Sequence, residues 1–292
     1  MREELAKLKA QLAAHEGLTG QGLAGEELGA RGGGLFSLGA RSVDAALGGG
    51  LARGALHEVL AETVLDTASA SGLASVLAHR AANGRPVVWI RDDGVCREAG
   101  MPYAPGLAEM GLDPDNMLLV FARNGLDALR AANESAACDA VGAVLIEIWG
   151  APKALTLTAT RRLALAASLS GVTLVMMRAG ASPIPSAATT RWSVRAAPSS
   201  PAMANAPGLP VCALTLQRHR AGPAGHTWNV ELRRENARSN AGDSDEEIIR
   251  YDACLGDAPA LSGGMVPLPS GRPHDAEPET AGGAGTAARR TG

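Results

Sequence analysis

The stretch that decides the fold covers residues 37–62 and reads SLGARSVDAALGGGLARGALHEVLAE. Its three consecutive glycines, Gly48–Gly50, permit backbone conformations that are closed to other residues. Asp44 precedes them and is expected to cap a short helix. The apolar run at residues 55–61 has the composition of a strand. The stretch therefore predicts a glycine-rich turn that leads into the first strand of an α/β core.

Downstream of this stretch, helix and strand patterns alternate. Helices are predicted at 71–82, 105–110, 126–136 and 154–169, and strands at 86–90, 117–121, 143–148 and 172–177. Repeated units of this kind favour a parallel sheet with helices on both faces. After Arg178, prolines interrupt three shorter strands predicted at 192–196, 211–218 and 227–232. We expect these three to be antiparallel strands added at one edge of the sheet.

The stretch at 37–62 resembles the segment that enters the nucleotide-binding core of RecA and KaiC-like ATPases. Their pattern is S-x-G-x-x-x-[LV]-D-x-x-L-G-G-G-[LI]-x-x-G. The residues that match it are Ser37, Gly39, Val43, Asp44, Leu47, Gly48, Gly49, Gly50, Leu51 and Gly54. The resemblance implies a RecA-like, mostly parallel sheet flanked by helices, with antiparallel edge strands.

A phosphate-binding loop, G-x-x-x-x-G-K-[ST], should follow the first strand. Its glycines expose backbone N–H groups to the phosphates, and its lysine neutralises their charge. Residues 61–74 instead read AETVLDTASASGLA, which contains neither lysine nor arginine, and Glu62 and Asp66 would repel phosphate. Loss of these groups removes most of the electrostatic stabilisation of phosphoryl transfer. We therefore expect a degenerate Walker A loop, no cofactor and no ATPase activity.

Three carboxylates occupy positions that matter in the RecA fold. Asp92 and Asp93 follow a strand where the resemblance places the water-activating acid, and Glu147 ends an apolar run at the place of the Walker B acid. As functional residues they would polarise water and hold magnesium. As structural residues they would cap the next helix or meet an arginine. Without the lysine, we favour the structural interpretation for these remnants of a nucleotide site.

A later pair of motifs is similar to the ImuA family. TTRWSVRAAPS at 189–199 is followed by LQRHRAGPAGHTWNVEL at 216–232. ImuA proteins are RecA- and SulA-related members of bacterial damage-inducible mutagenesis cassettes. The resemblance spans residues 1–232. It implies a non-catalytic accessory protein of translesion synthesis in the SOS response to DNA damage, a form of error-prone DNA repair. The implied partners are a Y-family polymerase-like cassette subunit and RecA, whose subunit interface such a core can mimic.

Two alternatives come from other functional classes. The first is a RecA/KaiC-type ATPase with an unorthodox phosphate loop. The second is a SulA-like inhibitor that caps a polymerising partner. The missing lysine argues against the first alternative, and a neighbouring gene for a Y-family-like protein would argue against the second.

Six residues are candidates for a partner or DNA surface: Arg191, Trp192, Arg195, Arg218, Arg220 and Trp228. Arginines beside aromatic rings suit single-stranded DNA. The alternative is a set of strand-edge arginines packed over the two tryptophans. Residues 1–241 carry a net charge of only +2, a poor basis for neutralising many phosphates. In RecA two further loops contact DNA, but their counterparts at 149–153 and 178–190 hold one cation each, Lys153 and Arg178. We expect DNA binding to be weak or absent and protein partners to dominate.

The two ends of the chain differ from the predicted core at residues 35–240. Residues 1–34 predict a helix with Leu5, Leu8 and Leu12 on one face, which is either solvated or an arm that docks on a partner, followed by a glycine-rich linker. Residues 241–292 form an acidic tail with nine acids and four arginines, which we expect to be largely disordered. The sequence lacks a signal-peptide pattern and an apolar run of membrane-spanning length. It also lacks metal-ligand spacing. We expect a cytoplasmic protein.

Overall fold

The computed structural model describes residues 33–201 and 208–232, and the main chain of strand β11 (Ala253–Cys254). The predicted N-terminal helix, with Leu5, Leu8 and Leu12, lies outside the described residues. So does the acidic tail, apart from the main chain of β11. The predicted boundary at residue 34 falls next to the first strand, β1 (Leu35–Phe36).

The glycine-rich stretch folds into a small antiparallel pair, β1 and β2 (Leu51–Ala52), with helix α2 (Arg41–Ala46) between them. Gly50 has φ +134°, and a Cβ there would lie 2.3 Å from the carbonyl oxygen of Phe36, so only glycine fits. The prediction that Asp44 caps the helix is wrong, because Ala40 is the N-cap. The Asp44 carboxylate instead accepts hydrogen bonds from Leu38 N (2.7 Å) and Ser37 Oγ (2.5 Å). It thereby closes the turn that precedes the helix.

A nine-stranded sheet forms the body of the described chain. Its order is β11-β10-β9-β8-β3-β7-β6-β4-β5. The newly named strands are β3 (Leu56–Ala61), β4 (Val87–Asp92), β5 (Met117–Ala122), β6 (Ala143–Trp149), β7 (Thr173–Ala179), β8 (Thr190–Ala197), β9 (Val211–His219) and β10 (Thr227–Glu231). The strands from β8 to β5 are parallel, and β9, β10 and β11 are antiparallel additions at one edge. The predicted fold class, a mostly parallel sheet flanked by helices with antiparallel edge strands, is confirmed.

One strand departs from the prediction. β8 was expected to be antiparallel, but it runs parallel to β3, with Trp192 opposite Val59. The ten residues between β7 and β8 can extend to about 33 Å, which is enough to return the chain to the end of the sheet where the parallel strands begin, without a helix. The antiparallel addition therefore begins one strand later, at β9.

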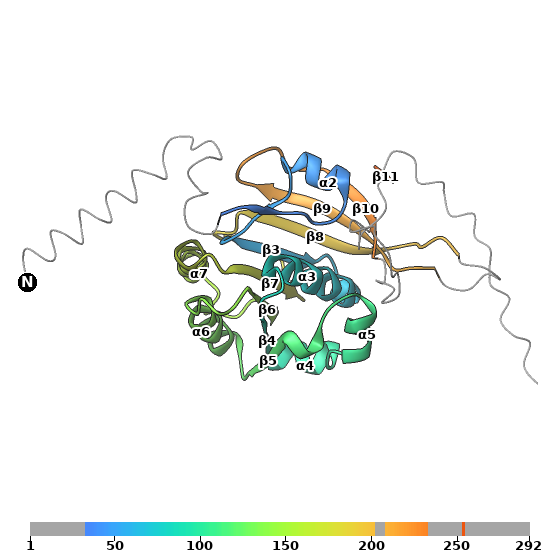
Figure 1. Cartoon of the computed structure of the whole chain (residues 1–292). Coiled ribbons are helices and arrows are strands. Elements are labelled where there is room, and N and C mark those ends of the chain that lie inside the picture. Colours follow the sequence, from blue (N-terminus) through green and yellow to red (C-terminus); the bar gives the residue numbers. More distant parts are fainter. Residues whose placement is uncertain (1–32, 202–207, 233–252, 255–292) are drawn as a thin grey trace, which may run out of the picture. The chain divides into compact units, whose positions relative to one another are not determined.

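Helices cover both faces of the sheet. Figure 1 shows α6 (Gly125–Ala136) and α7 (Leu157–Ser170) on one side of the strands and α3 (Thr67–Ala82), α4 (Asp93–Ala99) and α5 (Ala104–Glu109) on the other. The described chain also contains two single turns of 3-10 helix, η1 (Val64–Asp66) and η2 (Pro114–Asn116). The sequence predicted α3 from residue 71, four residues late, and did not predict α4. No helix of the described residues has the length and apolar character to cross a membrane.

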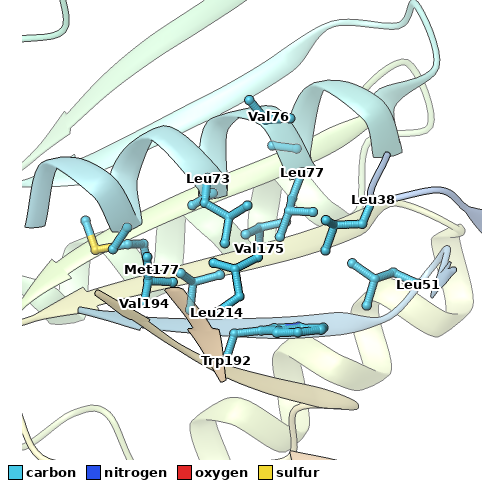
Figure 2. Close-up of a cluster of buried hydrophobic side chains, with 14 of the residues drawn as sticks. Leu38, Leu51, Leu73, Val76, Leu77, Val175, Met177, Trp192, Val194 and Leu214 are labelled. Atoms are coloured by element: carbon cyan, nitrogen blue, oxygen red, sulfur yellow. The ribbon is translucent and has the colours of Figure 1, made fainter. Parts of the chain in front are cut away.

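The core consists of two apolar layers, one on each face. Along β6, Leu145 packs in the layer beneath α3 and Ile146 packs in the layer beneath α6 and α7. Because both faces are covered, the central parallel strands carry apolar residues on both faces instead of alternating, apart from a few buried polar side chains. Figure 2 shows the α3 layer, where Trp192 lies among Val194, Leu214 and the inward side chains of the helix.

Candidate functional site

The turn between β3 and α3 stands where a phosphate-binding loop would be, and a carboxylate of the chain itself closes it. Asp66 is the N-cap residue of α3. One of its oxygens accepts hydrogen bonds from Thr63 N (3.0 Å) and Thr63 Oγ1 (2.6 Å). The other accepts from Ala196 N in β8 (2.8 Å). The helix N-terminus, which attracts anions, therefore already has an anion beside it.

The charge of this carboxylate is stabilised where it lies. Burial by itself raises the pKa of Asp66, but the hydrogen bonds from Thr63 and Ala196 and the nearby charge of Arg195 outweigh burial and lower the pKa below its ordinary value. Asp66 is 5% exposed and stays ionised near neutral pH. A phosphate brought to this turn would meet a fixed negative charge and no lysine.

The acid at the Walker B position is held by an arginine. Glu147 in β6 is fully buried, and it accepts hydrogen bonds from Arg91 Nε (2.5 Å) in the adjacent strand β4 and from Ser71 Oγ in α3. Arg91 also donates to the carbonyl oxygen of Gly100 (2.6 Å). The carboxylate thus joins two strands and a helix.

The two acids after β4 make local contacts. Asp92 caps α4, accepting from Val95 N (2.9 Å), and its other oxygen accepts from Trp149 N (3.1 Å). Asp93 is exposed and pairs with Arg97 one turn along the same helix (3.1 Å). Together with Glu147, these residues have the caps and arginine partners that the structural interpretation of the sequence requires. In the described ranges, no cluster of three or more His, Cys, Asp or Glu side chains is placed to hold a metal ion.

A cavity of about 510 Å³ adjoins the closed turn. It lies between the first half of α3, strand β4 and the segment after α4, and its lining is mostly apolar, with Val64, Leu65, Met101 and Leu107 among the lining residues. Leu65 is 91% exposed at its rim. Trp89 also lines it, and the buried Nε1–H of this residue has no hydrogen-bond acceptor among the described residues.

A second charged cluster lies on the other face of β3, around the buried Glu58. Its carboxylate accepts from Arg191 Nε (2.7 Å) and Ser186 Oγ (2.8 Å), and it pairs with Arg178 Nη1 at 3.5 Å. Arg178 is 1% exposed. Burial lowers its pKa, and the charge of Glu58 partly offsets that effect. Because Glu58, Arg178 and Arg191 come from β3, β7 and β8, their contacts link these three strands.

The same arginines hold the segment between β7 and β8. Arg191 Nη2 donates to Ile184 O (2.5 Å) and Ser186 Oγ (2.8 Å), and Arg218 Nη1 in β9 donates to Ser186 O (2.7 Å). Arg178 reaches Ser182 O (3.4 Å). The resemblance to RecA predicted that this segment corresponds to a DNA-contacting loop, and its single cation, Arg178, is buried. Of the two loops, only the first therefore has an exposed cation, Lys153.

The six candidate surface residues do not form one surface. Trp192 and Trp228 are 0% and 3% exposed and pack against each other with ring centroids 6.1 Å apart. The expectation that both rings lie at the edge of a surface is wrong. Their side chains point from β8 and β10 into the apolar layer beneath α3. Arg191 and Arg218 are engaged internally, as described above, whereas Arg195 and Arg220 are exposed.

Sequence reasoning missed the residues that organise this site. Arg91 and Glu58 each lie inside a strand, where a lone charge among apolar residues signals a buried pair, and that signal was available. His57 next to Glu58 is fully buried, with ring nitrogens 2.8 Å from both Thr190 Oγ1 and Ala52 O. Ala52 is five residues away, but Thr190 is 133 residues away in the chain, so no local pattern could have identified that partner.

No known protein family matches the sequence, and no curated protein matches it. Solved structures do resemble it, among them one described as the RadB recombinase. The two chains are 16% identical with a TM-score of 0.49, and the match covers 68% of this chain and 96% of that one. A likeness at this level says nothing about activity, ligand or partner.

Proposed function

We propose that this chain is a non-catalytic RecA-like accessory protein of damage-induced translesion synthesis, and that it acts through contacts with other proteins. The observation that carries the non-catalytic part is the closed turn. The Asp66 carboxylate, at the start of α3, accepts hydrogen bonds from Thr63 and Ala196 of the chain itself, and no lysine or arginine lies between Arg53 and Arg80. A nucleotide would have to displace a carboxylate that three hydrogen bonds hold.

The state of Glu147 supports the same proposal. A magnesium-binding or water-polarising acid needs a free oxygen that faces the phosphates, but both oxygens of Glu147 are engaged, one by Ser71 and the other by Arg91. Releasing either oxygen would leave the buried Arg91 or the half-buried Ser71 hydroxyl without its Glu147 contact, which is unfavourable. The role in translesion synthesis rests on the resemblance of residues 189–199 and 216–232 to ImuA proteins.

A nucleotide titration tests the non-catalytic part. Purified protein is titrated with Mg²⁺–ATP in a calorimeter, and phosphate release is measured in parallel. We expect no saturable heat and no hydrolysis above background. Hydrolysis that disappears in Glu147→Gln, with the fold of that variant verified by circular dichroism, would establish the ATPase alternative instead. Asp93→Asn is the matched control, because its exposed pair with Arg97 does not support the core.

The partner part is tested with purified components. We expect this chain to co-elute in size-exclusion chromatography with a Y-family polymerase-like subunit of a mutagenesis cassette, and to bind RecA. Binding to neither would contradict the proposal. If it instead shortened the filaments of an unrelated polymerising protein in light scattering, the SulA-like alternative would replace the accessory role.

A further inference from the structure

The cavity beside the closed turn is edged by apolar side chains that are exposed to solvent. Val64 and Leu65 of η1 and Met101 of the segment after α4 line it, and they are 53%, 91% and 59% exposed. Its volume of about 510 Å³ falls within the range of roughly 300–1,000 Å³ that is usual for ligand sites with mostly apolar walls. Exposed apolar groups gathered around a hollow mark a binding surface. The cavity is therefore suited to receiving an apolar group.

Trp89 gives this cavity a polar requirement. The side chain is 4% exposed, and its Nε1–H, which can only donate, has no acceptor among the described residues. A buried donor without an acceptor is unfavourable. Ser71 and Ser75 also line the cavity. Their hydroxyls already donate, to Glu147 and to the carbonyl oxygen of Gly72, and each hydroxyl oxygen keeps a lone pair. A ligand that fits must accept one hydrogen bond, and it can donate another.

The charges around the cavity disfavour an anionic ligand. Arg91 lines the cavity, but its charge is balanced by Glu147, with Nε and Oε2 2.5 Å apart. Glu98 also lines the cavity, is exposed, and has no ion pair with another described residue. Asp66 adds a negative charge at the adjoining turn. The unbalanced charge is therefore negative, and a cation beside the apolar group of the ligand is favoured.

We propose that this cavity receives the side chain of a tyrosine that stands next to a lysine or arginine in a partner protein. The ring contacts the apolar lining, its hydroxyl accepts from Trp89 Nε1–H and donates to a serine oxygen, and the neighbouring cation faces Glu98. Tyrosine combines an apolar body with a polar tip, and it is a common anchor at the centre of protein interfaces. The inference rests on the proposed function in one respect, namely that the chain works through contacts with other proteins.

Peptide titration tests this site. The full-length protein is titrated with acetyl-Ala-Lys-Tyr-Ala-amide or with its Phe counterpart, and tryptophan emission reports binding because Trp89 and Trp149 both line the cavity. We expect the Tyr peptide to bind saturably and about threefold to tenfold more tightly than the Phe peptide, which is the effect of one hydrogen bond. In Trp89→Phe this ratio should fall to about one. Equal affinities in the parent protein, a ratio that persists in Trp89→Phe, or no saturable binding would each overturn the proposal.

Two substitutions outside the core locate the bound peptide. Leu65→Glu should abolish binding without lowering the melting temperature, since this side chain is almost fully exposed. Leu169→Glu is the matched control, because Leu169 is 64% exposed on α7, on the opposite side of the sheet (Figure 1). Glu98→Gln should weaken the Tyr peptide but not an analogue with Ala in place of its Lys. Unchanged affinity in Leu65→Glu would refute binding at this cavity, and an unchanged affinity in Glu98→Gln would refute the basic neighbour.

The source of the tyrosine is tested separately. The chain contains one tyrosine that follows an arginine, Tyr251 after Arg250. Peptide binding that appears only in Tyr251→Ala would show that the chain's own segment takes the cavity, and it would overturn the assignment to a partner. The titration contains no cassette protein, so it fails independently of the co-elution experiment. Co-elution without peptide binding would leave the accessory role standing and overturn this site.

Discussion

Replacing Glu58 by glutamine should weaken the fold more than any other single change of one charge to a neutral isostere. The substitution keeps the shape of the side chain but removes the negative charge that faces Arg178 and Arg191, whose side chains are 0% and 12% exposed. Removing one partner of a buried pair typically costs about 3–5 kcal/mol, because the remaining charge stays buried. We expect the lower half of this range, because the amide oxygen can still accept one hydrogen bond.

Urea denaturation followed by circular dichroism measures this effect. A loss of about 3 kcal/mol is a large share of the roughly 5–15 kcal/mol by which domains are stable, and it corresponds to a melting temperature lower by about 6–12 °C. Asp93→Asn is the control. Its pair is exposed, so it should change stability by less than about 0.5 kcal/mol. Adding Arg178→Met to Glu58→Gln should restore part of the loss. A Glu58→Gln variant within 1 kcal/mol of the parent, with an unchanged denaturant slope, would refute the reasoning.

Three further outcomes follow from the described contacts. Burial lowers the pKa of His57 from 6.5 to about 4, so the unfolded chain binds this proton more readily. Stability should therefore fall, by up to about 3 kcal/mol, as pH drops through that interval, and urea midpoints should lose this dependence in His57→Gln. Asp66→Ala removes the acceptor of Thr63 N and Ala196 N and should cost about 1–3 kcal/mol; a urea midpoint equal to that of the parent would contradict a stabilising role for these contacts. Because Arg195 and Arg220 are exposed, any single-stranded DNA affinity measured by anisotropy should depend on salt with a slope near −1.4 and vanish in the double alanine variant, whereas a slope beyond about −3 would point to other contacts.

The sheet could be predicted because its strands are buried on both faces. Strands β4, β6 and β7 appear in the sequence as unbroken apolar runs between turn residues, and such runs are typical of parallel strands. The direction of β8 could not be predicted in this way. Its connection from β7 contains no helix, and arginines from β8 and β9 hold it in place instead, as Arg191 does at Ile184. That contact joins segments that no local pattern relates.

The absence of a phosphate-binding lysine could be predicted from the sequence, but the contacts that close the turn in its place could not. Residues 61–74 contain no lysine. For Asp93 and Glu147, an arginine partner was one of the structural roles considered, and the structure pairs them with Arg97 and Arg91. The closing of the turn by Asp66 was not predicted, because its third hydrogen bond comes from Ala196, which is 130 residues away in the chain. Trp192 and Trp228 were expected at an edge, but β8 and β10 direct both side chains into the apolar layer beneath α3.

The closing of the turn before α3 by Asp66 has a consequence for timing. In an ATPase core, bound and hydrolysed nucleotide define two states, and their exchange sets how long a complex lasts. A first helix that is completed by its own chain needs no ligand, so under the proposed function its binding surfaces exist as soon as the protein has folded. Mass action then governs assembly. The cell would control such a protein through synthesis and degradation, and the amount of complex would track the abundance of the chain.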